Sequence, residues 1–235
     1  MTWNYPFGKK RRLRGKSSNA GLTLIESLVA VAVIGITAAS VGPVILVSTA
    51  TRIQSQRAEQ ALQIAQGEVD RVRQIVEQGF VADAGGSREY TAADLSIAST
   101  PTGITKSVDA AAPTGPPAAA FNPTDYQVAR QIDIDGDGTF DFAVQAYRLG
   151  DAEFSDGTRP VAFPMGVRVY EHDAVNGGGT LATTPARLGT AAGLGERDEK
   201  PLAVLYTEIV KSDERQSLCD YFEYQGSTSS TLDCS

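Results

Sequence analysis

Four aspartates lie close together in the stretch DIDGDGTFD at residues 133–141: Asp133, Asp135, Asp137 and Asp141. Calcium prefers carboxylate oxygens, and the start of a calcium-binding EF-hand loop has a similar spacing of aspartates around glycine. The pattern is incomplete, because its twelfth position is Val144, where a bidentate glutamate is expected. Two interpretations stay open: a calcium site, or an Asp/Gly-rich hairpin turn that binds no ion.

The two cysteines, Cys219 and Cys234, lie near the C-terminus. Outside the cytoplasm two such thiols are expected to pair. The disulfide would close a loop of about 15 residues and contribute about 3 kcal/mol in the chain-entropy model. The alternative is a pair of free thiols. A structural zinc site is not expected, because two cysteines and the single histidine, His172, rarely suffice as its ligands.

Motifs that indicate catalysis are lacking in the sequence. It contains no Gly-x-Ser-x-Gly elbow, no phosphate-binding loop and no dinucleotide-binding fingerprint. His172 follows the end of an expected strand and is predicted to be exposed. We therefore do not expect an enzyme.

The charge is unevenly distributed along the chain. Six basic residues and no acidic ones precede Gly21, and without these six the formal charge falls from −7 to −13. So acidic a body is a poor candidate for nonspecific nucleic-acid binding, which requires clustered lysine and arginine. The basic end is better interpreted as a topology signal that stays cytoplasmic, with the rest of the chain outside.

The segment that follows is apolar and long. Residues 22–47 read LTLIESLVAVAVIGITAASVGPVILV and contain one ionisable residue, Glu26. As a helix, 26 residues extend about 39 Å, which exceeds the ~30 Å hydrocarbon core. The apolar region of an ordinary secretory signal is only about 7–15 residues long. This segment can therefore remain in the membrane.

Glu26 is unusual, because a carboxylate near the start of a membrane helix is costly without a partner. A cut after Gly21 would make Leu22 a new N-terminus, and Glu26 could then neutralise that amine or the amine of a neighbouring subunit. The alternative is a carboxylate that the helix dipole favours at a helix N-terminus.

The run Gly21-Leu22-Thr23-Leu24-Ile25-Glu26, after a basic leader and before an apolar helix, resembles the type III (prepilin) signal of type IV pilins and type II secretion pseudopilins. The resemblance implies cleavage after Gly21 by a prepilin peptidase, methylation at Leu22, and use of Glu26 to register subunits. Pro43 is a second match, at position 22 of the processed chain. Leu22 departs from the family, in which phenylalanine or methionine is commoner. The resemblance covers about residues 15–80.

Gly42 and Pro43 weaken the helix, because proline lacks a backbone donor and crowds the carbonyl of Ala39. The resemblance implies that residues 35–44 can melt when subunits pack into a filament. Small residues also recur there at a spacing of four, which would let helices approach closely. The alternative is small residues that merely face lipid.

From residue 51 to 79 the helical pattern continues outside the membrane. An apolar stripe recurs at spacings of three and four, and Gly79 is a plausible stop. The stripe consists of Ala58, Ala61, Leu62, Ala65, Val69, Val72 and Val76. Its modest length and small alanines favour packing on a sheet over a parallel coiled coil.

The rest of the chain is expected to be a globular domain. Residues 80–124 form an Ala/Gly/Pro-rich surface connection, and residues 125–235 form a β domain whose C-terminal disulfide region is typical of many pilins. Strands are predicted at 126–134, 139–148, 161–170 and 201–210, with the DGDG turn joining the first two. The predicted class is α+β: a long, half-transmembrane helix on a four-stranded antiparallel sheet, as in pilins.

The prediction is a minor pilin or pseudopilin. Its leader and helix are similar to those of pseudopilins for polysaccharide secretion in gliding filamentous bacteria (the hormogonium polysaccharide system). The resemblance implies a prepilin peptidase, other pilin subunits, an assembly ATPase and a platform membrane protein as partners. The chain would cross the cytoplasmic membrane once, with residues 1–21 inside, before entering an extracytoplasmic filament. The alternative is a non-polymerising, membrane-tethered adhesin or carbohydrate binder that uses calcium.

Overall fold

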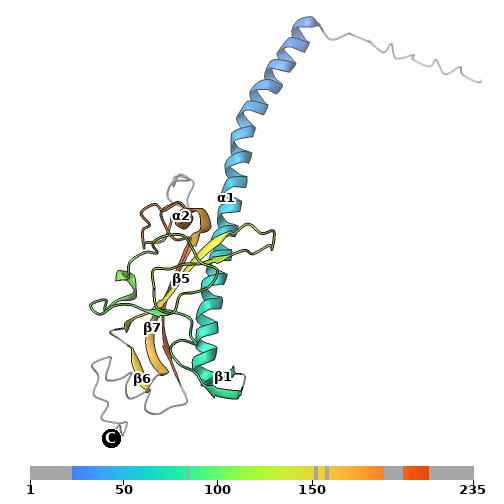
Figure 1. The fold of residues 1–235 in the computed structure, drawn as a ribbon. Coiled ribbons are helices and arrows are strands. Elements are labelled where there is room, and N and C mark those ends of the chain that lie inside the picture. The colour runs from blue at the N-terminus through green and yellow to red at the C-terminus, as the bar shows by residue number, and fades with distance from the viewer. Residues whose placement is uncertain (1–22, 84, 151–152, 157–158, 188–197, 212–235) are drawn as a thin grey trace, which may run out of the picture. The chain divides into compact units, whose positions relative to one another are not determined.

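The computed structural model describes residues 23–83, 85–150, 153–156, 159–187 and 198–211 (Figure 1). One helix, α1 (Leu24–Gln78), is followed by β1 (Phe80–Asp83) and β2 (Gly86–Glu89). Next come β3 (Ala98–Ser99), a short 3-10 helix (Ser107–Asp109), β4 (Arg130–Ile132) and β5 (Phe142–Arg148). The last elements are β6 (Phe154–Asp156), β7 (Arg159–Glu171), α2 (His172–Asn176) and β8 (Ala203–Val210).

The chain divides into two compact units, residues 1–48 and 49–235, close to the predicted end of the membrane segment at residue 50. In the first unit, α1 is long and apolar enough to cross a membrane. The large apolar side chains that the structure describes from Leu24 to Val47 are 52% to 82% exposed. So many exposed apolar side chains require a membrane or another protein around them.

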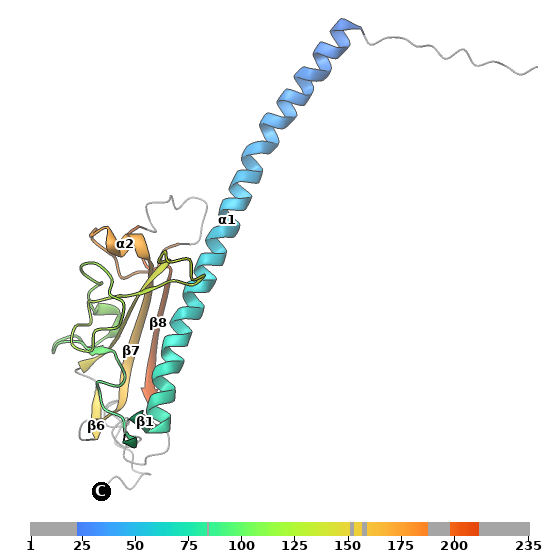
Figure 2. The ribbon, with the colours of Figure 1, turned by 45° about the vertical axis from the view of Figure 1, so that its right-hand side comes forward.

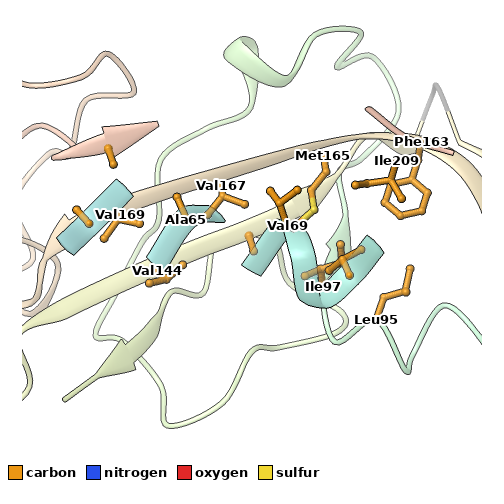
Figure 3. Close-up of a cluster of buried hydrophobic side chains, with 14 of the residues drawn as sticks. Ala65, Val69, Leu95, Ile97, Val144, Phe163, Met165, Val167, Val169 and Ile209 are labelled. Carbon is orange, nitrogen blue, oxygen red and sulfur yellow. The ribbon is translucent and has the colours of Figure 1, made fainter. Parts of the chain in front are cut away.

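In the second unit, α1 packs on the sheet along the predicted stripe. Figure 2 shows β7 and β8 running beside this half of the helix. Ala61, Ala65 and Val69 are buried against sheet residues that include Val144 and Val167 (Figure 3). Packing on a sheet is therefore confirmed, except that Leu62, predicted in the stripe, is 42% exposed.

The helix ends where the sequence predicts. Gly79 follows the last helical residue with φ +72°, a left-handed conformation that favours glycine. Its N–H donates to the carbonyl of Ile75 at 3.1 Å, and its own carbonyl accepts from Tyr90 at 3.2 Å.

All four predicted strands form, as β4, β5, β7 and β8, and neighbours pair antiparallel. The prediction of a four-stranded antiparallel sheet is nevertheless wrong, because the sheet in the described part of the chain has six strands and is mixed. The short strand β3 pairs parallel with β5, and β6 pairs antiparallel with one end of β7. Each added strand pairs with one end of β5 or β7, on a side where that end has no partner among the four predicted strands.

The connection before residue 125 differs most from its prediction as a surface loop. Tyr90, Leu95 and Ile97 are fully buried in the same core as the helix stripe. Leu95 and Ile97 lie beside the helix in Figure 3. This connection therefore closes the core between helix and sheet.

The other face of the sheet is covered by the same connection, through the fully buried Arg168 of β7. Its guanidinium donates to the carbonyls of Ser107, Val108, Ala110 and Ala111 at 2.8 to 3.2 Å. Five donors in a planar fork suit such a cluster of carbonyl oxygens. Arg168 therefore anchors the covering loop to the centre of the sheet.

Candidate functional site

The start of α1 is the first candidate site. Thr23 precedes the helix, and its side-chain oxygen accepts a hydrogen bond from the Glu26 N–H at 3.3 Å. Thr23 is thus the N-cap, and Glu26 is the third helical residue, as in a capping box. The exposed Glu26 lies where the helix dipole favours a carboxylate, which agrees with the simpler of its two interpretations.

Two predicted processing residues, Gly21 and Leu22, lie outside the described residues, as do Cys219 and Cys234 of the predicted disulfide. Glu26 and the backbone of Gly42 and Pro43 are described. The helix runs without interruption through Gly42 and Pro43 in this single chain. The predicted melting concerns packed subunits and stays a prediction.

The acidic turn is the second candidate site, and it joins β4 to β5 as predicted. Carboxylate oxygens of Asp133, Asp135 and Asp141 all lie within 4.8 Å of one another. Asp137 is not among them; one of its oxygens accepts the Thr139 N–H at 2.7 Å. The structure therefore brings together three of the four predicted ligands.

Backbone donors also hold these carboxylates in place. Asp133 accepts hydrogen bonds from the N–H groups of Gly136 at 2.7 Å and Gly138 at 3.0 Å, and these bonds lower the pKa of Asp133. Asp141 accepts the Ile134 N–H at 3.1 Å. Three convergent carboxylates are a ligand set that calcium accepts. The same hydrogen bonds would also stabilise the turn without an ion.

His172 lies beside this turn, and the prediction that it is exposed is wrong. Its side chain is 14% exposed, and its ring centroid lies 5.5 Å from that of Phe140. Its backbone N–H donates to the Asp141 carbonyl at 3.0 Å. His172 therefore packs the base of the turn against the start of α2.

A buried ionic cluster was missed by sequence reasoning. Glu68 of α1 is not part of the predicted apolar stripe, yet its side chain is only 8% exposed and forms ion pairs with Arg71 and Arg130. The Arg130 guanidinium stacks on the Phe121 ring, and its carbon atom lies 4.6 Å from the ring centroid. The only sign of this cluster in the sequence is that Glu68 directly precedes Val69, a residue of the buried stripe.

The comparisons with known proteins bear on the first site. The prokaryotic N-terminal methylation motif matches residues 16–42. No curated protein and no solved structure shows a significant match. The chain therefore has the prepilin-type signal of type IV pilins and pseudopilins, which supports a type IV pilin-like or pseudopilin class.

Two further predictions follow from this motif in general form. It implies processing by a prepilin peptidase and assembly with other pilin subunits. With the apolar helix, it fits a membrane-anchored single-pass protein.

Proposed function

We propose that this protein is a minor pilin or pseudopilin, a structural subunit of a type IV pilus-like or type II secretion-like filament. The observation that supports this most is the methylation motif at 16–42, which overlaps the exposed, apolar start of a 55-residue helix. The later part of the same helix belongs to a packed α+β domain.

In this proposal residues 1–21 stay in the cytoplasm, and the peptidase cuts after Gly21. Leu22 then carries a positive amine, and Glu26 of a neighbouring subunit neutralises it when the helix enters the filament. Paired in this way, neither charge is left alone in an apolar environment. An assembly ATPase and a platform membrane protein drive the insertion.

Incorporation into filaments tests this proposal. Glu26→Gln removes the carboxylate and keeps its size, whereas Glu59→Gln removes an exposed carboxylate of the same helix. We expect the wild type and Glu59→Gln in sheared surface filaments, and Glu26→Gln only in the membrane. Equal incorporation of all three, or of none, would contradict the proposal.

The filament system we propose serves polysaccharide secretion and gliding motility. This refinement rests on the similarity of the leader and helix. A deletion strain that secretes polysaccharide normally would contradict it while leaving the pilin-like class intact.

We also propose that the turn at residues 133–141 binds a calcium ion. The convergence of Asp133, Asp135 and Asp141 supports this proposal. The ion would offset the mutual repulsion of three carboxylates, and it would tie β4 to β5 at their exposed ends. A tethered domain that binds calcium and retains residues 1–21 would favour the alternative, a binding module that never polymerises.

A further inference from the structure

In the second unit, β8 is a long strand at the edge of the sheet. It has eight residues, and among the described strands it pairs only with β7. An uncovered edge offers unpaired N–H and carbonyl groups to other chains, so natural proteins shorten, bend or cover their edge strands.

The other outer strands of this sheet are protected in these ways. β3 and β6 have only two and three residues, and a register shift interrupts β6. The outer side of β4 is covered, because its Gln131 N–H donates to the Ala118 carbonyl at 2.8 Å. In β8, by contrast, the sequence AVLYTEIV contains no proline or lysine, and the described register with β7 has no shift.

Proline fixes which way the backbone of β8 points. Pro164 of β7 is the register partner of Glu208, and it has no N–H to donate. Its carbonyl accepts the Leu149 N–H at 3.0 Å, on the β5 side. Pro164 therefore forms no ladder bond with β8, and the N–H and carbonyl of Glu208 point away from β7.

The same direction holds for every second residue of the strand. The Lys211 N–H donates to the Val161 carbonyl at 2.8 Å, so odd-numbered residues bond to β7 and even-numbered ones face outward. Val204 and Tyr206 are even-numbered. Among the described residues, the backbone N–H of neither has a hydrogen-bond partner.

A groove of about 340 Å³ lies between β8 and α1, which run side by side in Figure 2. Leu205 lines it and is only partly buried, although it packs against the core. The other lining residues are Gln66, Val69, Asp70, Arg73 and Thr207. An extended segment that paired with the edge of β8 would direct alternate side chains toward this groove.

The chain itself contains a segment that fits this edge. Residues 212–235 continue directly from the end of the described chain after β8. Within them, residues 217–224 read SLCDYFEY, which is rich in strand-forming side chains and contains no proline or glycine. This run has the same length as β8. The preceding residues 212–216, SDERQ, are polar, and hairpin loops commonly have about 2–5 residues.

We propose that residues 217–224 pair with the outer edge of β8 as an antiparallel strand. The outward groups of Val204 and Tyr206 then gain partners, and the new side chains cover Leu205. A segment joined by so short a connection has a high effective concentration, so it excludes a strand from a separate chain. The pairing concerns the second unit alone and does not depend on processing or filament assembly.

Residue-resolved amide hydrogen exchange of the full chain in detergent micelles tests the inference. Leu205 and Thr207 are the internal reference, because their N–H groups face β7. We expect the amides of Val204 and Tyr206 to exchange as slowly as these two. Fast exchange at Val204 and Tyr206, beside slow exchange at the reference amides, would overturn the inference.

A proline pair identifies the covering segment. Adjacent residues of a strand point their N–H groups to opposite sides, so Tyr221→Pro combined with Phe222→Pro removes a bond to β8 in any register. We expect Val204 and Tyr206 to lose their protection while Leu205 keeps it.

The matched control is Ser229→Pro combined with Ser230→Pro, which lies in the same tail outside the proposed strand. It should leave the exchange of all these amides unchanged. Protection of Val204 and Tyr206 that persists with Tyr221→Pro and Phe222→Pro would show that another segment covers the edge. Wild-type protection that disappears on dilution would show that a second copy covers it. Either result, or an equal loss with both proline pairs, would overturn the inference.

Discussion

Tyr147 of β5 and Gly166 of β7 are partners in the strand register, and the tyrosine ring occupies the space that a Cβ of residue 166 would fill. The ring is held there by two contacts. Its hydroxyl donates to the Ser107 carbonyl at 2.5 Å, and its centroid lies 5.2 Å from the guanidinium carbon of Arg168.

Gly166→Ala should therefore destabilise the domain. The added methyl group must displace a buried ring, and overpacking of this kind costs about 1–3 kcal/mol. Urea unfolding of the wild type and of Gly166→Ala measures the difference in their free energies of unfolding. Gly67→Ala is the matched control, because it meets open space in a helix and should stabilise by about 0.5–1 kcal/mol. Equal effects of the two substitutions would contradict the packing.

Glu68→Gln should also destabilise the domain, because it leaves the partly buried Arg130 without its carboxylate. Breaking a fully buried pair costs about 3–5 kcal/mol, and we expect about 2 kcal/mol here because the Arg130 side chain is 28% exposed. Asp70 and Arg73 form an ion pair with the same i,i+3 spacing as Glu68 and Arg71, but both of their side chains are exposed. Asp70→Asn should therefore change the free energy of unfolding by less than about 1 kcal/mol. A Glu68→Gln value as small as the control would contradict the cluster.

We expect the Asp94 carboxylate to make the free energy of unfolding depend on pH. Its carboxylate accepts two hydrogen bonds from Arg88, at 2.6 and 2.8 Å, and also bonds with Thr91, which together hold its pKa far below the ordinary value. A depressed folded-state pKa contributes stability above the unfolded pKa of about 3.9, and this stability is lost as pH falls toward the folded value.

Asp94→Asn should therefore destabilise the domain at pH 7, and the difference from wild type should shrink below about pH 4. Unfolding curves measured over pH 2–8 would show this, with the exposed Asp109→Asn as a control that stays close to wild type. A difference that does not vary with pH would contradict the role of the Asp94 charge.

Calcium should raise the melting temperature of the wild-type chain, because only the folded turn gathers the three carboxylates. Asp135→Asn removes one of them, and we expect it to abolish the rise, whereas Asp109→Asn should preserve it. If calcium leaves the wild-type melting temperature unchanged, the turn is a hydrogen-bonded hairpin that binds no ion.

How far the sequence predicts this structure depends on how local each signal is. The buried stripe from Ala58 to Val76 and the alternation in β5 and β7 are periodic over many residues, so helix and strands could be predicted. The connection before residue 125 lacks such a period. The burial of Tyr90, Leu95 and Ile97 could not be predicted from this alanine- and glycine-rich stretch, because elements distant in sequence surround these side chains.

The same limit applies to the candidate sites. The prepilin-type signal is a local motif, and the family comparison supports it. Glu68 and Arg130 are 62 residues apart in sequence, so only the fold brings them together. The acidic turn is intermediate, since its spacing predicted four ligands and the described structure brings the carboxylates of three of them together.

The most direct test of the central claim is the intact mass and N-terminal sequence of the full chain, expressed with and without a prepilin peptidase. We predict a start at Leu22 only when the peptidase is present. Trp3 is the single tryptophan, so processing should also abolish tryptophan fluorescence. A chain that keeps residues 1–21 in both samples would contradict the account, and the protein would then be a membrane-tethered domain rather than a filament subunit.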